Sequence, residues 1–359
     1  MADTTALYPL KLPPSFREKI WGSRDLSPLF GVQPNPIGEA WYTFEENVIA
    51  NGAYRGRTLG EVVLLLGARL MGGSYQPSTL RRRSAGEAAQ PATPRAYFPV
   101  LSKLLFTSDK LSVQVHPDDS YALAHEGGPG KTEMWYVVQA APGASIALGL
   151  TRHMSPAEMR SAAESGAIEQ FLNWVPVQAG QVFFVPPGTL HSIGAGLVLC
   201  EIQQNSDLTY RFFDFGRAGD DGNPRALHID QAVAVTKQGG YPGPCAPFPL
   251  PGDKNVEREL LAACKYFATE RMAWSGLLEY QPDPGHADLL IFIHGEGRMA
   301  NDAYAPGDAY LIPAEAPPVQ MQATTATEVI RSYIPEVARL REELRRAGAT
   351  IARIADLIP

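Results

Sequence analysis

Short apolar and alternating segments follow one another through the middle of this chain. Between residues 97 and 217, runs such as "KLSVQVHP", "EMWYVVQA" and "QVFFVPP" are separated by turns rich in glycine and proline. A period of two over so few residues, bounded by such turns, is typical of β-strands. Many short strands in close succession predict a sandwich or a barrel.

A second block with the same pattern extends from about residue 264 to residue 333. The Pro-rich segment "GGYPGPCAPFPLPGD" separates the two blocks and marks a domain boundary. We therefore expect a mainly β protein with two barrels and a few added helices. The predicted division is an N-terminal irregular or helical segment packed on the first barrel (1–95), the first barrel (96–240), the second barrel (255–334) and a helical tail (335–359).

Helical periodicity is confined to a few places. Apolar residues recur at helical spacing from Leu59 to Leu70. A second helix is expected after Ser155, which is a good N-cap and is followed by proline at the first helical position. The amphipathic tail is expected to pack against the neighbouring barrel. Residues 73–94 are polar, include the run Arg81–Arg83, and are predicted to form an exposed loop.

Composition and charge argue against several classes of function. The 359 residues carry a formal charge of −7, which argues against a general nucleic-acid binder and leaves room only for a local positive site. The start of the chain has no basic segment leading into an apolar run, and no stretch is apolar enough to span a membrane. Three widely spaced cysteines without CxxC spacing suit reduced thiols, so we expect a cytoplasmic protein.

One strand combines polar groups in an unusual way. In "LSVQVHPDD", Ser112, Gln114 and His116 share one face, while valines occupy the other. An amide and an imidazole that point inward either hydrogen-bond within a polar core or hold a ligand. An aspartate at 118 or 119 is expected to cap the helix that follows.

Further polar residues occupy comparable positions. Lys131 and Glu133 share a strand face, His191 follows a Pro-Pro-Gly turn, and Arg211 lies on a later strand. Taken singly, each has a structural interpretation as a hydrogen-bonded or ion-paired residue. As a set, two histidines, a carboxylate and an amide oxygen form a plausible ligand shell for a divalent cation. Because these ligands come from three strands, they can converge inside a barrel and leave one coordination position open for catalysis.

The spacing G-x5-P-x-G-x2-H, from Gly180 to His191, matches the second cupin signature. Together with "LSVQVHPDD", "GKTEMWYVV" and the stretch from Glu201 to Arg211, it resembles the type I mannose-6-phosphate isomerases in their short bacterial form. The segments "PLKLPPSFREKIWGS" and "IGEAWYTFEENVIANGAYRG" extend the resemblance over most of residues 8–235. It implies two cupin jelly-roll barrels.

The second block departs from this pattern. It keeps a cupin-like "GDAYLIPA" from Gly307, but no histidine follows, and His294 has no ligand set around it. We expect a degenerate, metal-free cupin with a structural role.

The resemblance also implies roles for individual residues. It predicts one Zn²⁺ per chain, although cobalt, manganese and iron accept the same ligand types. The implied metal ligands are Gln114, His116, Glu133 and His191. The implied catalytic residues are Arg211, Lys131 and Glu201. The implied substrate-binding residues are Ser112, Lys131, Arg211 and, where some relatives have a lysine that faces the phosphate, Arg217.

The implied reaction interconverts mannose 6-phosphate and fructose 6-phosphate through an enediol(ate). Arg211 is always charged and suits charge stabilisation or phosphate binding. Glu201 is a candidate proton carrier, and Lys131 would act as acid or base only with a lowered pKa. The sequence leaves open which group removes the carbon-bound proton.

Two other functions are compatible with a cupin pocket: a non-catalytic sugar-phosphate-binding protein and an iron-dependent oxygenase. The glutamine ligand, the lack of a third histidine and the cationic residues weigh against the oxygenase. The intact set around Lys131, Glu201 and Arg211 weighs against the binder. The expected partner is a small sugar phosphate, with neither nucleic acid nor membrane. A monomer and a homodimer are both compatible with the sequence.

Overall fold

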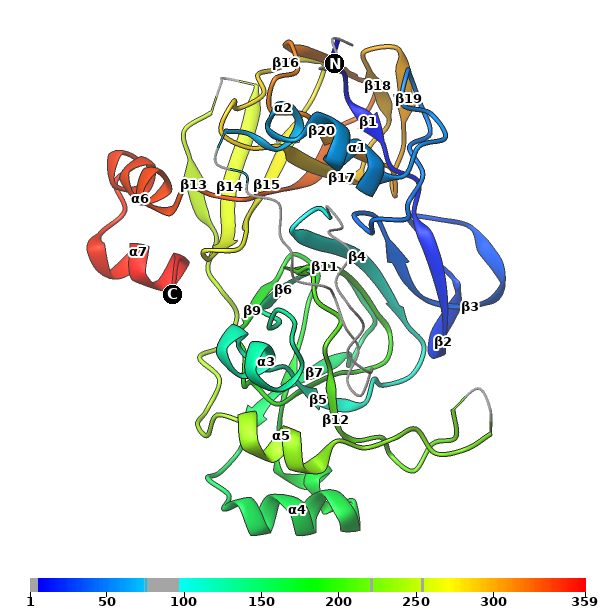
Figure 1. The fold of residues 1–359 in the computed structure, drawn as a ribbon, viewed down its shortest axis with the longest axis vertical. Coiled ribbons are helices and arrows are strands. Elements are labelled where there is room, and N and C mark those ends of the chain that lie inside the picture. The colour runs from blue at the N-terminus through cyan, green and yellow to red at the C-terminus, as the bar shows by residue number, and fades with distance from the viewer. Residues whose placement is uncertain (1–5, 74, 76–96, 220–221, 253–254) are drawn as a thin grey trace.

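The computed structural model describes residues 6–73, 75, 97–219, 222–252 and 255–359. It confirms a mainly β protein in which two barrels are stacked along the long axis of the molecule (Figure 1). Each barrel consists of two antiparallel sheets. The expected loop at residues 73–94, with Arg81–Arg83, lies almost entirely outside the described residues.

The first barrel contains the residues with candidate chemistry. Its sheets have six and five strands, and each neighbouring pair is antiparallel. The six-stranded sheet has the order β2 (Ser15–Asp25), β3 (Val32–Trp41), β4 (Val100–Thr107), β11 (Leu197–Gln204), β6 (Glu133–Ala140) and β9 (Val182–Val185). The five-stranded sheet has the order β12 (Tyr210–Phe213), β5 (Val113–Val115), β10 (His191–Ile193), β7 (Ser145–Leu150) and β8 (Leu172–Pro176).

The second barrel is built in the same way from sheets of seven and four strands. The larger sheet has the order β1 (Leu10–Lys11), β20 (Ala309–Ile312), β17 (Asp288–His294), β22 (Thr327–Tyr333), β15 (Ala268–Trp274), β14 (Val256–Ala263) and β13 (Phe248–Leu250). The smaller sheet has the order β16 (Leu277–Tyr280), β21 (Val319–Ala323), β18 (Gly297–Met299) and β19 (Asp302–Tyr304).

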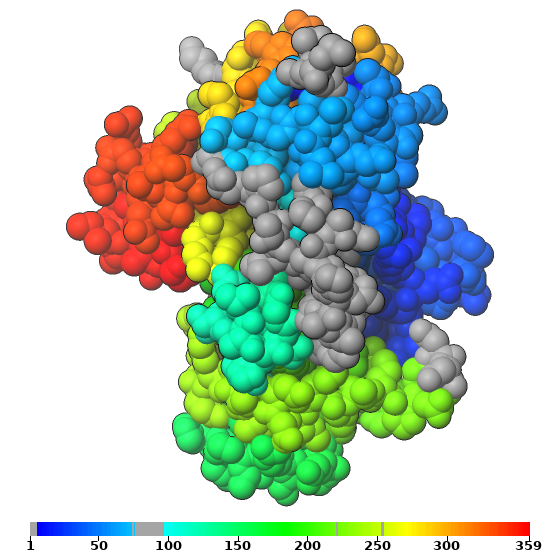
Figure 2. Space-filling view, in the orientation of Figure 1, coloured from blue at the N-terminus to red at the C-terminus, as the bar shows by residue number. Residues whose placement is uncertain are grey.

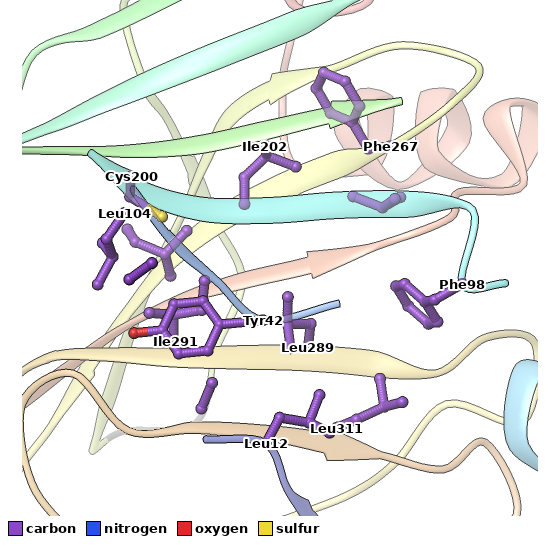
Figure 3. Close-up of a cluster of buried hydrophobic side chains, with 14 of the residues drawn as sticks. Leu12, Tyr42, Phe98, Leu104, Cys200, Ile202, Phe267, Leu289, Ile291 and Leu311 are labelled. Atoms are coloured by element: carbon purple, nitrogen blue, oxygen red, sulfur yellow. The ribbon is translucent and has the colours of Figure 1, made fainter. Parts of the chain in front are cut away.

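The largest hydrophobic cluster lies between the barrels. Side chains from β4 and β11 of the first barrel face side chains from β17 and β20 of the second (Figure 3). On β11, Cys200 and Ile202 belong to this cluster, so the intervening Glu201 points into the first barrel. Both faces of β11 are therefore covered, and every residue of the strand is buried. The labelled members of the cluster are Leu12, Tyr42, Phe98, Leu104, Cys200, Ile202, Phe267, Leu289, Ile291 and Leu311.

The N-terminal segment differs from the expectation of an irregular or helical element packed on the first barrel. Strands β2 and β3 are part of the first barrel, but β1 pairs with β20 of the second, with Leu10 opposite Leu311. Helices α1 (Leu59–Leu66) and α2 (Ala68–Met71) also join the second barrel. The backbone N–H of Ala314 donates to the carbonyl oxygen of Leu70 at 2.9 Å. This segment therefore links the two barrels.

The capping predictions are confirmed. Asp118 caps α3 (Asp119–His125) through its side chain. Ser155 and Glu158 form a capping box at α4 (Pro156–Ser165), with proline in the first turn. A short 3₁₀ helix follows at Ala167–Phe171, and α5 is Ile229–Val235.

The tail forms α6 (Val337–Arg346) and α7 (Ile351–Leu357) at one side of the second barrel (Figures 1 and 2). Buried Leu340 and Leu344 pack with Leu250 and Leu260 of the barrel, as the amphipathic pattern predicted. Among the residues described, no helix combines the length and apolar character that crossing a membrane requires.

Candidate active site

Three potential metal ligands converge inside the first barrel. His116 follows β5, Glu133 begins β6 and His191 begins β10, and all three are buried. The carboxylate oxygens of Glu133 lie 3.3 Å from His191 Nε2 and 3.6 Å from His116 Nε2. Donors about 2.0–2.2 Å from a tetrahedral zinc ion lie about 3.3–3.6 Å from one another. The spacing therefore fits one divalent ion.

Backbone carbonyls orient both imidazole rings. The Nδ1 atoms of His116 and His191 lie 2.9 Å from the carbonyl oxygens of Leu208 and Thr189. A carbonyl only accepts, so each Nδ1 carries the proton and each Nε2 presents a lone pair toward Glu133. The Nε2 of His191 is buried and has no hydrogen-bond partner among the described residues. An orphaned lone pair in this place is what a metal ion would satisfy.

The electrostatics keep both histidines neutral, as metal ligation requires. Burial lowers the pKa of His191 to about 4. Burial, followed by the charge of Lys131 and the neighbouring His191, holds the pKa of His116 well below its usual value.

Gln114 lies at the centre of β5, between two functional strands. It is opposite His191 on β10 and opposite Arg211 on β12. Its partly buried side chain lines a cavity of about 370 Å³. Six of the residues selected from the sequence line this cavity: Ser112, Gln114, Lys131, Glu133, Glu201 and Arg211.

Lys131 is a fixed cation beside the metal ligands. Its Nζ donates to Glu133, lies 3.3 Å from Glu201 Oε1 and lies 3.1 Å from His116 Nε2. Burial alone would lower the pKa of Lys131, but the carboxylates of Glu133 and Glu201 outweigh it and raise the pKa. The lysine is therefore protonated at neutral pH and suits donation of hydrogen bonds, not proton removal.

Glu201 has the opposite tendency. Burial raises its pKa, and the ammonium groups of Lys131 and Lys103 only partly compensate. Lys103 is its cross-strand partner on β4, with 3.9 Å between Nζ and Oε2. A carboxylate whose pKa is moved toward neutrality is well suited to accept and return a proton.

Two arginines, Arg211 and Arg225, also line the cavity. Arg211 donates from Nη1 to the carbonyl oxygen of Ala226 at 2.9 Å, and its buried Nε has no partner among the described residues. Burial, with the nearby charge of Arg225, lowers the pKa of Arg211. Arg225 also lines the cavity and donates from Nε to Asp214 at 2.7 Å.

The structure does not bring Arg217 to this cavity. Its guanidinium group donates to Asp214 at 2.7 Å and to Asp109 at 3.1 Å, and it is absent from the cavity wall. Sequence reasoning missed Arg225, Lys103 and His228, which do line the wall. Lys103 could have been predicted from the sequence, because it is the only charged residue in an otherwise mostly apolar strand.

The second barrel has no comparable metal group. Within the described part of the chain, the His116–Glu133–His191 cluster is the one group of three or more such ligands close enough to share an ion. His294 is exposed at the end of β17.

Comparisons with known proteins agree with this geometry. No protein-family model matches the chain. The chain is 36% identical over 315 residues to the mannose-6-phosphate isomerase of Streptococcus mutans, covering 85% of this chain and 92% of that protein. It is 32% identical over 323 residues to mannose-6-phosphate isomerase ManA of Bacillus subtilis, covering 85% and 93%. The crystal structure of the mannose 6-phosphate isomerase from Bacillus subtilis superposes with a TM-score of 0.76 at 30% identity, covering 90% of this chain and 99% of that one.

Proposed function

Because this chain belongs to the mannose-6-phosphate isomerase family, we propose that the cavity of the first barrel interconverts mannose 6-phosphate and fructose 6-phosphate. The observation that carries the proposal is the buried His116–Glu133–His191 cluster with Lys131 and Glu201 in contact with it. An aldose–ketose isomerase needs a polarised carbonyl and a proton carrier within one site.

One Zn²⁺ is the proposed cofactor. His116 and His191 would bind it through Nε2, Glu133 through its carboxylate, and Gln114 through its amide oxygen. The bound ion would act as a Lewis acid that stabilises negative charge on the substrate oxygens. The support from this chain is the spacing of the two imidazole rings and the Glu133 carboxylate, together with the orphaned Nε2 of His191.

Arg211 and Arg225 are the proposed phosphate-binding cations. A phosphate monoester carries about −1.5 to −2 charges at neutral pH. Arg211 has no carboxylate partner among the described residues, and a bound phosphate would offset the burial and the repulsion from Arg225 that lower its pKa. We assign to Arg225 the role that the family resemblance suggested for Arg217, because Arg225 lines the cavity.

The proton transfer is proposed to centre on Glu201. Its carboxylate would remove the proton from one of the two carbons, C1 or C2, and return it to the other. Lys131 would donate a hydrogen bond from Nζ to the oxygen on which negative charge develops, and Ser112 would orient a substrate hydroxyl. Arg211 would add positive charge near the same oxygens, since its position opposite Gln114 lies beside the metal ligands.

The decisive experiment measures conversion of mannose 6-phosphate to fructose 6-phosphate by the purified protein. Conversion should stop after chelation and return with zinc. Binding without turnover would identify a non-catalytic sugar-phosphate binder, and oxygen consumption would identify an oxygenase.

Two substitutions test the residue roles. Gln114→Ala should lower metal content, measured by elemental analysis, more than it lowers the free energy of unfolding. Arg211→Ala should leave the metal content unchanged and remove most turnover. Full zinc and full activity in Gln114→Ala would remove that residue from the ligand set, and unchanged activity in Arg211→Ala would remove it from the mechanism.

A further inference from the structure

Residues 226–228, which follow β12 in the chain, form three hydrogen bonds with Arg211. The N–H of His228 donates to the carbonyl oxygen of Arg211 at 2.7 Å, and the N–H of Arg211 donates to Nδ1 of His228 at 3.2 Å. The third bond is that from Arg211 Nη1 to the carbonyl of Ala226. Arg225, Ala226 and His228 all line the cavity, so this segment forms its wall at the arginine end.

The backbone contact determines which nitrogen of His228 carries a proton. Because Nδ1 accepts the N–H of Arg211, a neutral ring must carry its proton on Nε2. Burial, reinforced by the charge of Arg211 and opposed by Glu126, lowers the pKa of His228 and favours this neutral form. Among the described residues, Nε2 has no hydrogen-bond acceptor. The ring therefore offers one oriented donor that the protein itself does not use.

Three guanidinium groups lie near this donor, those of Arg211, Arg217 and Arg225. Asp109 and Asp214 pair with Arg217 and Arg225, and Glu126, the carboxylate that acts on His228, accepts the hydroxyl of Tyr210. Arg211 has no carboxylate partner among the described residues. An anion is therefore the ligand that this end of the cavity would attract, and an N–H group beside two guanidinium groups is a suitable third donor.

We propose that His228 is a substrate-positioning residue that donates its Nε2–H to the phosphate of the sugar phosphate while its Nδ1 holds the backbone of Arg211. The inference rests on the proposed function and adds to it a residue on which neither the metal nor the proton transfer depends. The phosphate would then be held by the guanidinium groups of Arg211 and Arg225 and by one imidazole N–H.

A matched pair of substitutions separates the two nitrogens of His228. In His228→Asn, the side-chain oxygen can still accept the Arg211 N–H, but the distal donor is lost. In His228→Gln, the amide nitrogen can take the place of Nε2, while the proximal acceptor is lost. Loss of a hydrogen bond to a charged group is expected to raise KM for mannose 6-phosphate about tenfold or more in the Asn variant. The Gln variant should recover most of that loss.

The inhibition constant of inorganic phosphate is the second readout. It should rise by a similar factor in His228→Asn, with kcat within about threefold of the wild-type value, because the distal donor binds ground state and transition state alike. Leu227→Ala serves as the control, since Leu227 is an exposed neighbour outside the cavity wall. Unfolding temperatures of all variants establish that each is folded.

The possible results are distinguishable. Unchanged KM and unchanged inhibition by phosphate in the Asn variant would overturn the proposal. A loss of kcat alone, equal in the Asn and Gln variants, would also overturn it, because it would reduce His228 to a support for Arg211. If the wild-type protein had no isomerase activity, the proposed function would fail. Calorimetric binding of inorganic phosphate by the wild type and His228→Asn would still test the donor.

If a variant does not fold, a measurement on the wild-type protein still tests the proposal. In protein with ¹⁵N-labelled histidine, the Nε2–H signal of His228 should shift on addition of inorganic phosphate, and no shift at saturation would contradict the proposal. The His228→Gln spectrum assigns the signal by its loss.

Discussion

The two barrels differ in how completely they compensate some of their buried charges. In the first barrel, burial raises the pKa of Glu201 and lowers the pKa of Arg211, so both charged forms are disfavoured. In the second barrel, burial would raise the pKa of Glu270 and Asp288, but Arg331 and the other groups that contact them together outweigh burial and lower both. The first arrangement is incomplete without a ligand, and the second is complete by itself.

The second barrel shows how completely such a network can be satisfied. Arg331 lies 3.0 Å from Glu270 and 2.8 Å from Asp288. Tyr333 donates its hydroxyl to Glu270 at 2.9 Å, and Tyr280 donates to Asp288 at 2.6 Å. The cavity beside this network measures about 660 Å³, larger than that of the first barrel. Cavity size and buried charge are therefore poor guides to chemistry here. Charges that the protein leaves uncompensated are better guides.

Glu201→Gln is expected to have the largest effect. Loss of the proton carrier should lower kcat by about 10²–10⁴-fold. The free energy of unfolding should not fall by more than about 1 kcal/mol, because the ionised carboxylate is disfavoured in the native protein. Steady-state kinetics and urea unfolding test both parts. A large loss of stability with retained kcat would reverse the assignment of Glu201.

Glu270→Gln is the matched change in the second barrel, at a side chain that is also buried. It leaves Arg331 and Arg258 partly uncompensated, so the free energy of unfolding should fall by about 3 kcal/mol. Because Glu270 is remote from the metal ligands in the fold, kcat/KM should stay within about twofold. Impaired kcat in a folded Glu270→Gln protein would show that the second barrel takes part in the reaction.

The pH dependence of the free energy of unfolding should differ between the buried carboxylates of the two barrels. The pKa values of Glu270 and Asp288 are lowered from 4.5 and 3.8, so their stabilisation is present above those values and is lost as pH falls below them. Glu201 has a raised pKa and adds no such loss. Stability measured by urea unfolding should therefore decrease below about pH 4.5, with a shallower slope in Glu270→Gln than in Glu201→Gln. Equal slopes would contradict the contrast.

The smallest effect should distinguish two arginines of one cluster. Arg225→Gln should raise KM for mannose 6-phosphate about tenfold, since Arg225 lines the cavity. Arg217→Gln should raise it by less than about threefold, because its guanidinium group is engaged by Asp109 and Asp214 away from the cavity wall. The same kinetic assay measures both, and the reverse order would restore the assignment made from the sequence.

Strand periodicity could predict most of the site because it is a local property. Alternation places Ser112 and Gln114 on the cavity wall, and it pairs Lys131 with Glu133. The resemblance suggested Arg217 as a phosphate ligand; that role stays a prediction, although Arg217 is not part of the cavity wall. The pairing of β12 with β5 shifts register between Arg211 and Phe213, and the backbone turns at Phe215, where φ is 57°. Strand periodicity therefore cannot predict where a side chain beyond this turn points.

Non-local features could not be predicted from the pattern. Arg225 reaches the cavity because of its bond to Asp214, eleven residues earlier, and nothing in "NPRALHID" indicates that contact. The pairing of β1 with β20 joins residues about 300 positions apart, and two residues are too few for a periodicity to be seen. Such contacts depend on how the barrels assemble.

The position of β1 also has a consequence for the order of folding during synthesis. The strand is synthesised about 300 residues before its partner Leu311. The strands of the first barrel all lie before residue 214. They can therefore pair while β1 still waits for its partner strand β20 to be synthesised. A cut in the linker near residue 245 would therefore separate the second barrel from its β1 edge strand and from α1 and α2, so the two halves are not expected to be exchangeable between proteins as modules.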